Sequence, residues 1–200
     1  MSDKYVLIIY YSCNNNTHEM AKHVSTGVES IHGIEAKIRT VPEIKAATDN
    51  NISASVPNQG CPYVTIEELE NCSGLILGSP TRFGNMASQL KHFLDQTTST
   101  WMSGKLVGKP AGCFTSTGSL HGGMETTIIS MMIPLLHHGM VFAGVPYTES
   151  SLLETKSGGT PYGPSHLAGG DSSRAIDNDE KKICTALGKR IAELSLKLST

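Results

Sequence analysis

The chain has 200 residues, of which 38% are apolar, and a formal net charge of −2 at pH 7. This size and composition predict one globular domain over residues 1–200, and the near-neutral charge argues against binding to nucleic acid or to an anionic membrane surface. No apolar stretch approaches the ~20 residues of a membrane-spanning helix, so no integral membrane segment is expected, and the N-terminus lacks a signal-peptide pattern.

The first elements have the pattern of a strand that leads into a helix. The run Tyr5–Tyr11 is continuously apolar, as expected for a strand that is covered on both faces of a parallel sheet. A polar turn, Ser12–His18, precedes a helix with an apolar stripe, for which Asn16 or Thr17 is the expected cap and Gly33 the stop.

The later segments continue this alternation of strands and helices. They predict a strand over 34–41, a long loop over 43–63, a capped helix over 65–71, a strand over 74–79, a helix over 86–98, a strand over 111–115, a helix over 125–138, a strand over 140–145 and a final helix over 177–198. The glycine-rich segment 146–176 is expected to be irregular, and either functional or part of a subunit interface. The whole pattern predicts a flavodoxin-like three-layer α/β sandwich, whose five-stranded parallel sheet has the order 2-1-3-4-5 and helices on both faces.

Three polar loops follow three apolar strands and are expected to converge at one edge of the sheet. They are Ser12–His18, Pro80–Met86 and Ser116–Gly123. The first loop runs into a helix N-terminus, which suits a phosphate, but it contains no Lys or Arg and so offers neutral donors alone. A plain solvated turn is the alternative interpretation.

The sequence motifs of several other enzyme and binding classes are absent. The Walker pattern, the GxGxxG dinucleotide pattern and the GxSxG elbow are absent, and no acidic cluster follows the strands as a response regulator requires. The five cysteines are scattered without a CxxC pair, which predicts reduced thiols in a cytoplasmic protein and no metal site. Cys13 is a candidate for a reactive thiol, although such a residue is more often a small side chain without a catalytic role.

Six ordered sequence blocks resemble the WrbA-type NAD(P)H:quinone oxidoreductases, which are flavodoxin-like FMN proteins. The blocks are Pro80–Met86, Phe93–Thr97, Ser116–Gly118, His137–Met140, Gly159–Gly163 and Ala168–Asp171. The resemblance implies an enzyme that uses FMN to reduce quinones to hydroquinones with NADH or NADPH, by ping-pong hydride transfer and without an obligatory catalytic side chain. It also implies a homotetramer.

The resemblance also assigns site residues. The resemblance implies that the FMN phosphate is held by residues of the first loop, namely Ser12, Cys13, Asn14, Asn15, Asn16 and Thr17. Those implied to line the flavin ring are Thr81, Arg82, Phe83, Ser116, Thr117, Gly118, Ser119, Leu120, His121 and His138. Trp101 is implied to wall the substrate side, and Arg82 is the residue least expected to be a surface charge. Both assignments have a structural alternative. A lone tryptophan is often a core residue, and adjacent histidines are often helix C-terminal caps.

The first loop departs from the family pattern. Asn14 and Asn15 stand where the family commonly has an aromatic residue and a glycine, and asparagine tolerates left-handed backbone better than other non-glycine residues. We therefore expect the loop to keep its shape, with altered nicotinamide affinity. Two alternatives remain open: a non-enzymatic electron carrier or FMN-dependent interaction module, and a homologue that binds no flavin.

Overall fold

The computed structural model describes residues 4–44 and 60–198, so most of the loop expected over 43–63 lies outside the described residues. Its elements in chain order are β1 (Tyr5–Tyr10), α1 (Asn16–Glu29), β2 (Glu35–Thr40), α2 (Ile66–Asn71), β3 (Gly74–Pro80), α3 (Ser88–Asp95), α4 (Thr98–Met102), β4 (Pro110–Thr117), α5 (Met124–His137), β5 (Val141–Phe142), α6 (Ser151–Glu154), β6 (Ser165–Leu167) and α7 (Asn178–Leu198).

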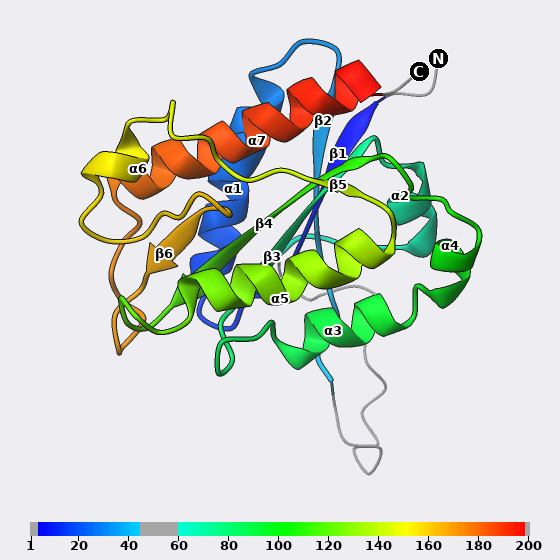
Figure 1. Ribbon diagram of the computed structural model, residues 1–200. Helices are drawn as coiled ribbons and strands as arrows, with labels where there is room; N and C mark the ends of the chain where they lie inside the picture. The colour runs from blue at the N-terminus through cyan, green and yellow to red at the C-terminus, as the bar shows by residue number, and fades with distance from the viewer. Residues whose placement is uncertain (1–3, 45–59, 199–200) are drawn as a thin grey trace.

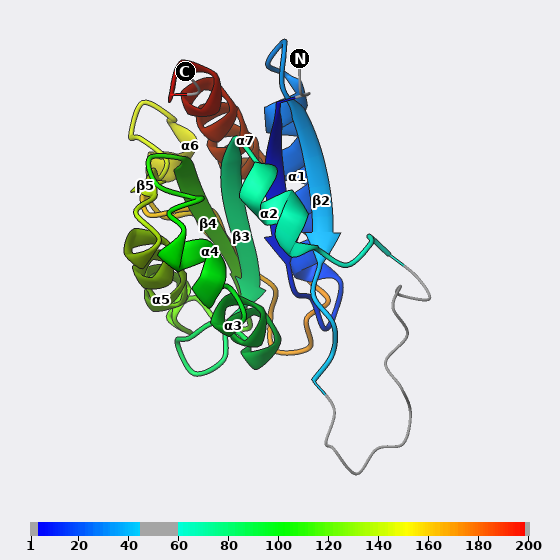
Figure 2. The ribbon, with the colours of Figure 1, turned by 90° about the vertical axis from the view of Figure 1, so that its right-hand side faces the viewer.

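These elements form a parallel sheet between two layers of helices. The strand order is β2-β1-β3-β4-β5, with β6 also paired to β4 (Figure 1). Helices α1 and α7 cover one face, and α3 and α5 cover the other (Figure 2). The predicted flavodoxin-like sandwich is confirmed.

Alternate residues of the central strands explain this arrangement. Leu7 and Ile9 of β1 pack with α3 and α5, whereas Ile8 packs with α1 and α7. Because side chains of a strand point to opposite faces in turn, a strand that is apolar at every position must be covered on both sides. The unbroken burial of β1 therefore fixes a helical layer on each face.

Helices α1 and α7 approach each other closely at two glycines. A Cβ atom added to Gly188 would lie 2.0 Å from the carbonyl oxygen of Val24, and one added to Gly27 would lie 2.0 Å from that of Thr185. No real Cβ contact is that short, so the spacing of these two helices depends on both residues lacking a side chain.

The fifth strand position is divided between two short strands, which corrects the prediction of one strand over 140–145. β5 pairs with Pro110 and Ala111 at the start of β4, and β6 pairs with Thr115–Thr117 at its end. The chain leaves the sheet between them, and segment 146–176 therefore contains a helix and a strand, contrary to the expectation that it is irregular. A strand of three residues shows no periodicity in the sequence, and it forms because the edge of β4 offers unpaired backbone groups.

Two helix starts differ in kind. The predicted capping box of Thr65 and Glu68 at α2 is confirmed, with both reciprocal hydrogen bonds present. By contrast, the N-cap of α1 is Asn15, in left-handed conformation and without a side-chain cap, so the predicted cap at Asn16 or Thr17 is wrong. The helix expected over 86–98 is the shorter helix α3, and a separate helix, α4, begins at Thr98.

Candidate cofactor site

The three polar loops meet at the carboxyl end of the sheet, as predicted. The backbone N–H of Thr81 donates to the carbonyl of Ser116 over 2.9 Å, and the hydroxyl of Thr127 donates to the hydroxyl of Thr81 over 2.8 Å. Between the loops lies a hollow of about 90 Å³, here called the small hollow. It is lined by Ser12, Cys13, Asn14, Asn16, Thr17, Pro80, Thr81, Arg82, Ser116, Thr117, Gly118, Ala168 and Ser172.

The small hollow has the hydrogen-bond donors of an anion-binding site, and most of these donors are uncharged. The hydroxyl oxygen of Ser12 is buried and has no hydrogen-bond partner among the described residues. The first N–H groups of α1 begin at Asn16 and lack acceptors within the helix, and the positive end of the helix dipole points the same way. Arg82 is the charged residue among the lining residues, and it is exposed. The hollow can therefore hold a phosphate group by hydroxyl, amide and backbone donors.

Asn15 adopts the conformation expected for it but points away from the small hollow. Its φ is 64°, which is the left-handed backbone that asparagine was expected to tolerate in this loop. Its side-chain amide donates to Glu19 over 2.9 Å, and its side-chain oxygen lies 2.9 Å from Nδ1 of His18. Asn15 thus shapes the loop through its backbone and secures the first turn of α1 with its side chain.

The second loop ends in a tight turn that projects into solvent. Arg82 and Asn85 exchange two backbone hydrogen bonds, and the two residues between them, Phe83 and Gly84, have φ values of 55° and 78°. This places the Phe83 side chain, 107% exposed, and the Arg82 guanidinium outside the fold. In the single chain Arg82 is therefore a surface charge, contrary to expectation, because the turn carries both side chains away from the core.

The third loop divides at the end of β4. Ser116 and Thr117 are buried and line the small hollow. The residues that follow, Ser119–His121, are exposed and do not line it. The structure thus brings the start of the predicted third-loop set to the hollow and leaves Ser119–His121 outside its lining.

A larger groove adjoins the small hollow. It has a volume of about 1350 Å³ and is lined by residues of α3, α4 and α5. Cys13 and Arg82 line both spaces, so they are continuous at the loop end. The other end of the groove is formed by Trp101 and His138.

His138 and Trp101 lie apart from the loop cluster within one chain, because neither lines the small hollow. Thr127 near the start of α5 touches the second loop, whereas His138 follows the last residue of α5. A helix of 14 residues is about 20 Å long. Trp101 lies with His138, because its indole N–H donates to the carbonyl of His137 over 2.8 Å.

His138 is a buried neutral histidine. It is 8% exposed, its Nε2 lies 2.9 Å from the hydroxyl of Thr97, and its Nδ1 has no partner among the described residues. Burial, and then the neighbouring His137, lower the pKa of His138 below its ordinary value. The groove thus contains a ring nitrogen that is free to accept or donate a hydrogen bond.

The lowered pKa of His138 predicts a loss of stability on acidification. Between its folded pKa and the unfolded value of about 6.5, the unfolded chain binds more protons, so the free energy of unfolding falls as pH falls. His18 and His23 have lowered pKa values for the same leading reason, burial, and contribute in the same direction. His138→Gln should therefore lose less stability than the wild type between pH 7 and pH 5.5 in urea unfolding. The control is His32→Gln, at an exposed site. If the free energy of unfolding of His138→Gln changed with pH as steeply as that of the wild type or of the control, the prediction would be contradicted.

The sequence prediction missed three residues of the small hollow. Pro80, Ala168 and Ser172 line it, although no role was assigned to them. The block Ala168–Asp171 was part of the resemblance and was the available signal. Its position follows from β6, which brings the chain back to the end of β4.

Comparisons with known proteins agree with this fold. A model of the family described as NADPH-dependent FMN reductase matches residues 5–149. The chain belongs to the NADPH-dependent FMN reductase family. The NAD(P)H dehydrogenase (quinone) of Trichlorobacter lovleyi is 44% identical over 200 residues, which cover 97% of this chain and 98% of that relative. The resemblance identified from the sequence blocks is thereby confirmed.

Solved structures show that this chain shares its fold with flavodoxins. The flavodoxin, WrbA-like protein from Agrobacterium tumefaciens superimposes with a TM-score of 0.68 at 21% identity, covering 98% of this chain and 99% of that one. Oxidised Flavodoxin 1 from Bacillus cereus superimposes with a TM-score of 0.60 at 17% identity, and the match covers 95% of this chain and 98% of that one.

No helix in the described part of the chain is long and apolar enough to cross a membrane. Residues 4–44 and 60–198 contain no cluster of three or more His, Cys, Asp or Glu side chains arranged to hold a metal ion. All five cysteines are free, and three of them are buried.

Proposed function

We propose that this protein is an FMN-dependent NAD(P)H:quinone oxidoreductase that works by ping-pong hydride transfer. The nicotinamide nucleotide loses a hydride and leaves as NAD(P)⁺, and the quinone then gains a hydride and a proton and leaves as hydroquinone. Bound FMN supplies the group that takes and returns the two electrons. The chain's own residues bind that cofactor, orient the two substrates and limit the access of water.

The small hollow carries this proposal. Its size suits a phosphate group and excludes a three-ring flavin, and its donors are the hydroxyls of Ser12, Thr17 and Ser116 with the N–H groups that open α1. The buried Ser12 hydroxyl without a partner among the described residues is the sharpest sign of a missing acceptor, because buried polar atoms are nearly always hydrogen-bonded. These residues fit the phosphate end of FMN.

The rim of the small hollow suits the flavin ring. Thr81, Arg82 and Gly118 line the hollow, and the residues next to them in sequence, Phe83 and Ser119–His121, are exposed. Planar rings bind where apolar surface and a few polar groups meet, so these segments are the proposed ring contacts. No side chain there is positioned as an obligatory acid, and we infer that water or His138 supplies the proton.

We also infer a homo-oligomer, and a tetramer from the family resemblance. His138 and Trp101 lie about a helix length from the small hollow in one chain, so they join a flavin site if a second copy presents them. Trp101 is 50% exposed and Met102 beside it 77% exposed, which leaves apolar surface for such a contact. A cytoplasmic location is proposed from the free cysteines.

Turnover with defined substrates tests the proposal. Purified protein reconstituted with FMN is expected to oxidise NADH or NADPH when benzoquinone is supplied, with parallel lines in double-reciprocal plots of initial rate. Absence of turnover with both nucleotides would overturn it. Accumulation of a stable one-electron reduced flavin without quinone turnover would instead favour the electron carrier. Light scattering of the same sample measures the oligomeric state.

A further inference from the structure

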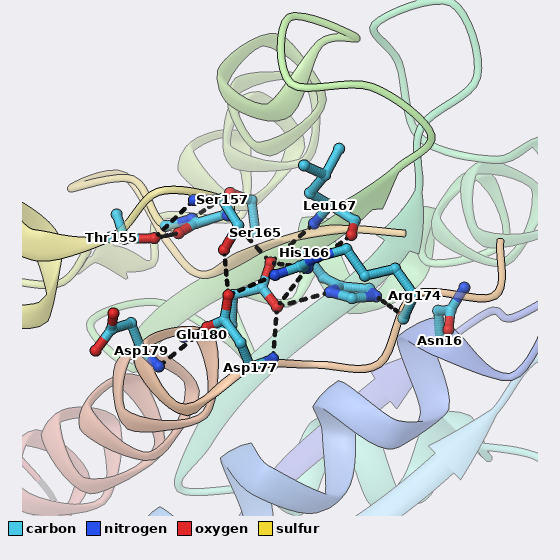
Figure 3. Close-up of polar contacts among 12 residues, drawn as sticks. Asn16, Thr155, Ser157, Ser165, His166, Leu167, Arg174, Asp177, Asp179 and Glu180 are labelled. Atoms are coloured by element: carbon cyan, nitrogen blue, oxygen red, sulfur yellow. Dashed lines mark hydrogen bonds and ion pairs between the residues drawn. The ribbon is translucent and has the colours of Figure 1, made fainter. Parts of the chain in front are cut away.

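A buried carboxylate organises the segment between β6 and α7. Glu180 has no exposed side-chain surface, and its two oxygens accept from the backbone N–H groups of Gly158, Leu167 and Asp177 over 3.0, 3.0 and 2.9 Å (Figure 3). Burial by itself raises its pKa, but hydrogen bonds, chiefly from His166, outweigh burial and lower it to about 2. Glu180 is therefore an ionised group inside the protein.

Two basic side chains complete the network around this charge. Nδ1 of His166 lies 2.9 Å from Glu180, and Nη1 of Arg174 lies 3.1 Å from each of its oxygens. The same Nη1 donates to the carbonyl of Leu167 over 2.8 Å, and Nη2 contacts Asp177. Arg174 thus joins the end of β6 to the start of α7, which a planar guanidinium does well because its donors have fixed directions.

This network closes the loop 168–174. The backbone N–H of Arg174 donates to the carbonyl of Ala168 over 3.0 Å, and that of Ala168 donates to Thr117 of β4 over 2.8 Å. Both ends of the loop are therefore fixed, one to the sheet and one to the network. Ala168 and Ser172 of this loop line the small hollow.

Ser172 is where the loop touches the start of α1. Its hydroxyl accepts from the side-chain amide of Asn14 over 3.1 Å, and its carbonyl accepts from that of Asn16 over 3.1 Å. Its φ of 60° is uncommon for serine, so this contact needs a loop that is held in place.

We propose that Glu180 and Arg174 are positioning residues for the FMN phosphate. They hold loop 168–174 so that Ser172 orients the amides of Asn14 and Asn16 at the small hollow. Neither residue lines the hollow, so both act through the loop. The inference rests on the proposed function, because it assumes that the small hollow receives the phosphate of FMN.

The test compares FMN with riboflavin, which is the same flavin without the phosphate. Apo protein is titrated with each, and flavin fluorescence reports the dissociation constants. In Glu180→Gln and in Arg174→Ala, FMN is expected to bind about tenfold more weakly, as for the loss of one charge-assisted hydrogen bond, with riboflavin affinity unchanged. Arg174→Lys should restore part of the FMN affinity. Glu193→Gln and Arg190→Ala, further along α7, are the matched controls.

The outcomes separate the two proposals. Equal losses for FMN and riboflavin would show a merely structural role and overturn the inference, as would unchanged FMN affinity in both variants. If Glu180→Gln does not fold, Arg174→Ala decides, since four other groups still donate to Glu180. Wild-type protein that binds neither flavin would overturn the proposed function itself, and the positioning role with it.

Discussion

Replacing Gly188 with alanine is expected to lower the free energy of unfolding by about 3 kcal/mol, in the upper range for overpacked sites. The added Cβ would lie 2.0 Å from the backbone oxygen of Val24, and backbone cannot yield as a side-chain tip does. Helix α7 must therefore move away from α1 and loosen the buried contacts of Ile183 and Leu187. Urea unfolding measures the change.

Helix propensity alone predicts the opposite sign for this substitution. Alanine in the middle of a helix is favoured over glycine by roughly 0.5–1 kcal/mol, so a stabilised Gly188→Ala variant would contradict the close approach of the two helices. Lys189→Ala, at the neighbouring exposed position, is the control and should change stability by less than about 0.5 kcal/mol. Gly27→Ala should behave like Gly188→Ala, because its Cβ would meet the carbonyl of Thr185 at the same distance.

Replacing Asn16 with aspartate is expected to weaken FMN binding by about 100-fold or more while riboflavin binding stays the same. The substitution keeps the side-chain shape but places a negative charge beside the proposed phosphate. Two unit charges 4 Å apart repel by about 4 kcal/mol at an effective dielectric constant of 20. Even after screening by solvent and salt, FMN affinity should therefore fall by about 100-fold. Titration of apo protein with the two flavins measures both constants.

The variant should still fold. Aspartate loses the hydrogen bond from Asn16 to Ser172, but a carboxylate at the first residue of α1 is favoured by the helix dipole, so the net change in stability is less than about 1 kcal/mol. Asn178→Asp makes the same change at the exposed first residue of α7, away from the small hollow. Unaltered FMN affinity in Asn16→Asp would show that the phosphate binds elsewhere.

Much of the fold was predictable because its signals are local. The continuous apolar run of β1 specifies a strand that is covered on both faces, and the spacing of Ile183, Leu187 and Ile191 specifies the buried side of α7. The Thr65–Glu68 capping box is a signal of the same local kind. Such patterns depend on neighbours within one or two turns, so they persist in any packing that the chain adopts.

The elements that were missed are those whose stability comes from distant partners. β6 has three residues and forms by pairing with Thr115–Thr117, about 50 positions earlier in the sequence. Likewise, nothing local indicates that His138 lies a helix length from the loops, at the far end of α5. Its place follows from the direction in which α5 crosses the sheet.

By itself, the sequence determined the parallel sheet, its three polar loops and the family to which the chain belongs. Only the tertiary structure decided which side chains meet at the small hollow. Ser172 contacts Asn14 and Asn16 across 158 and 156 positions of the sequence. The physical reason is that local propensity fixes how each segment folds, whereas contacts between segments so far apart exist only after the sheet, β6 and the Glu180 network have packed together.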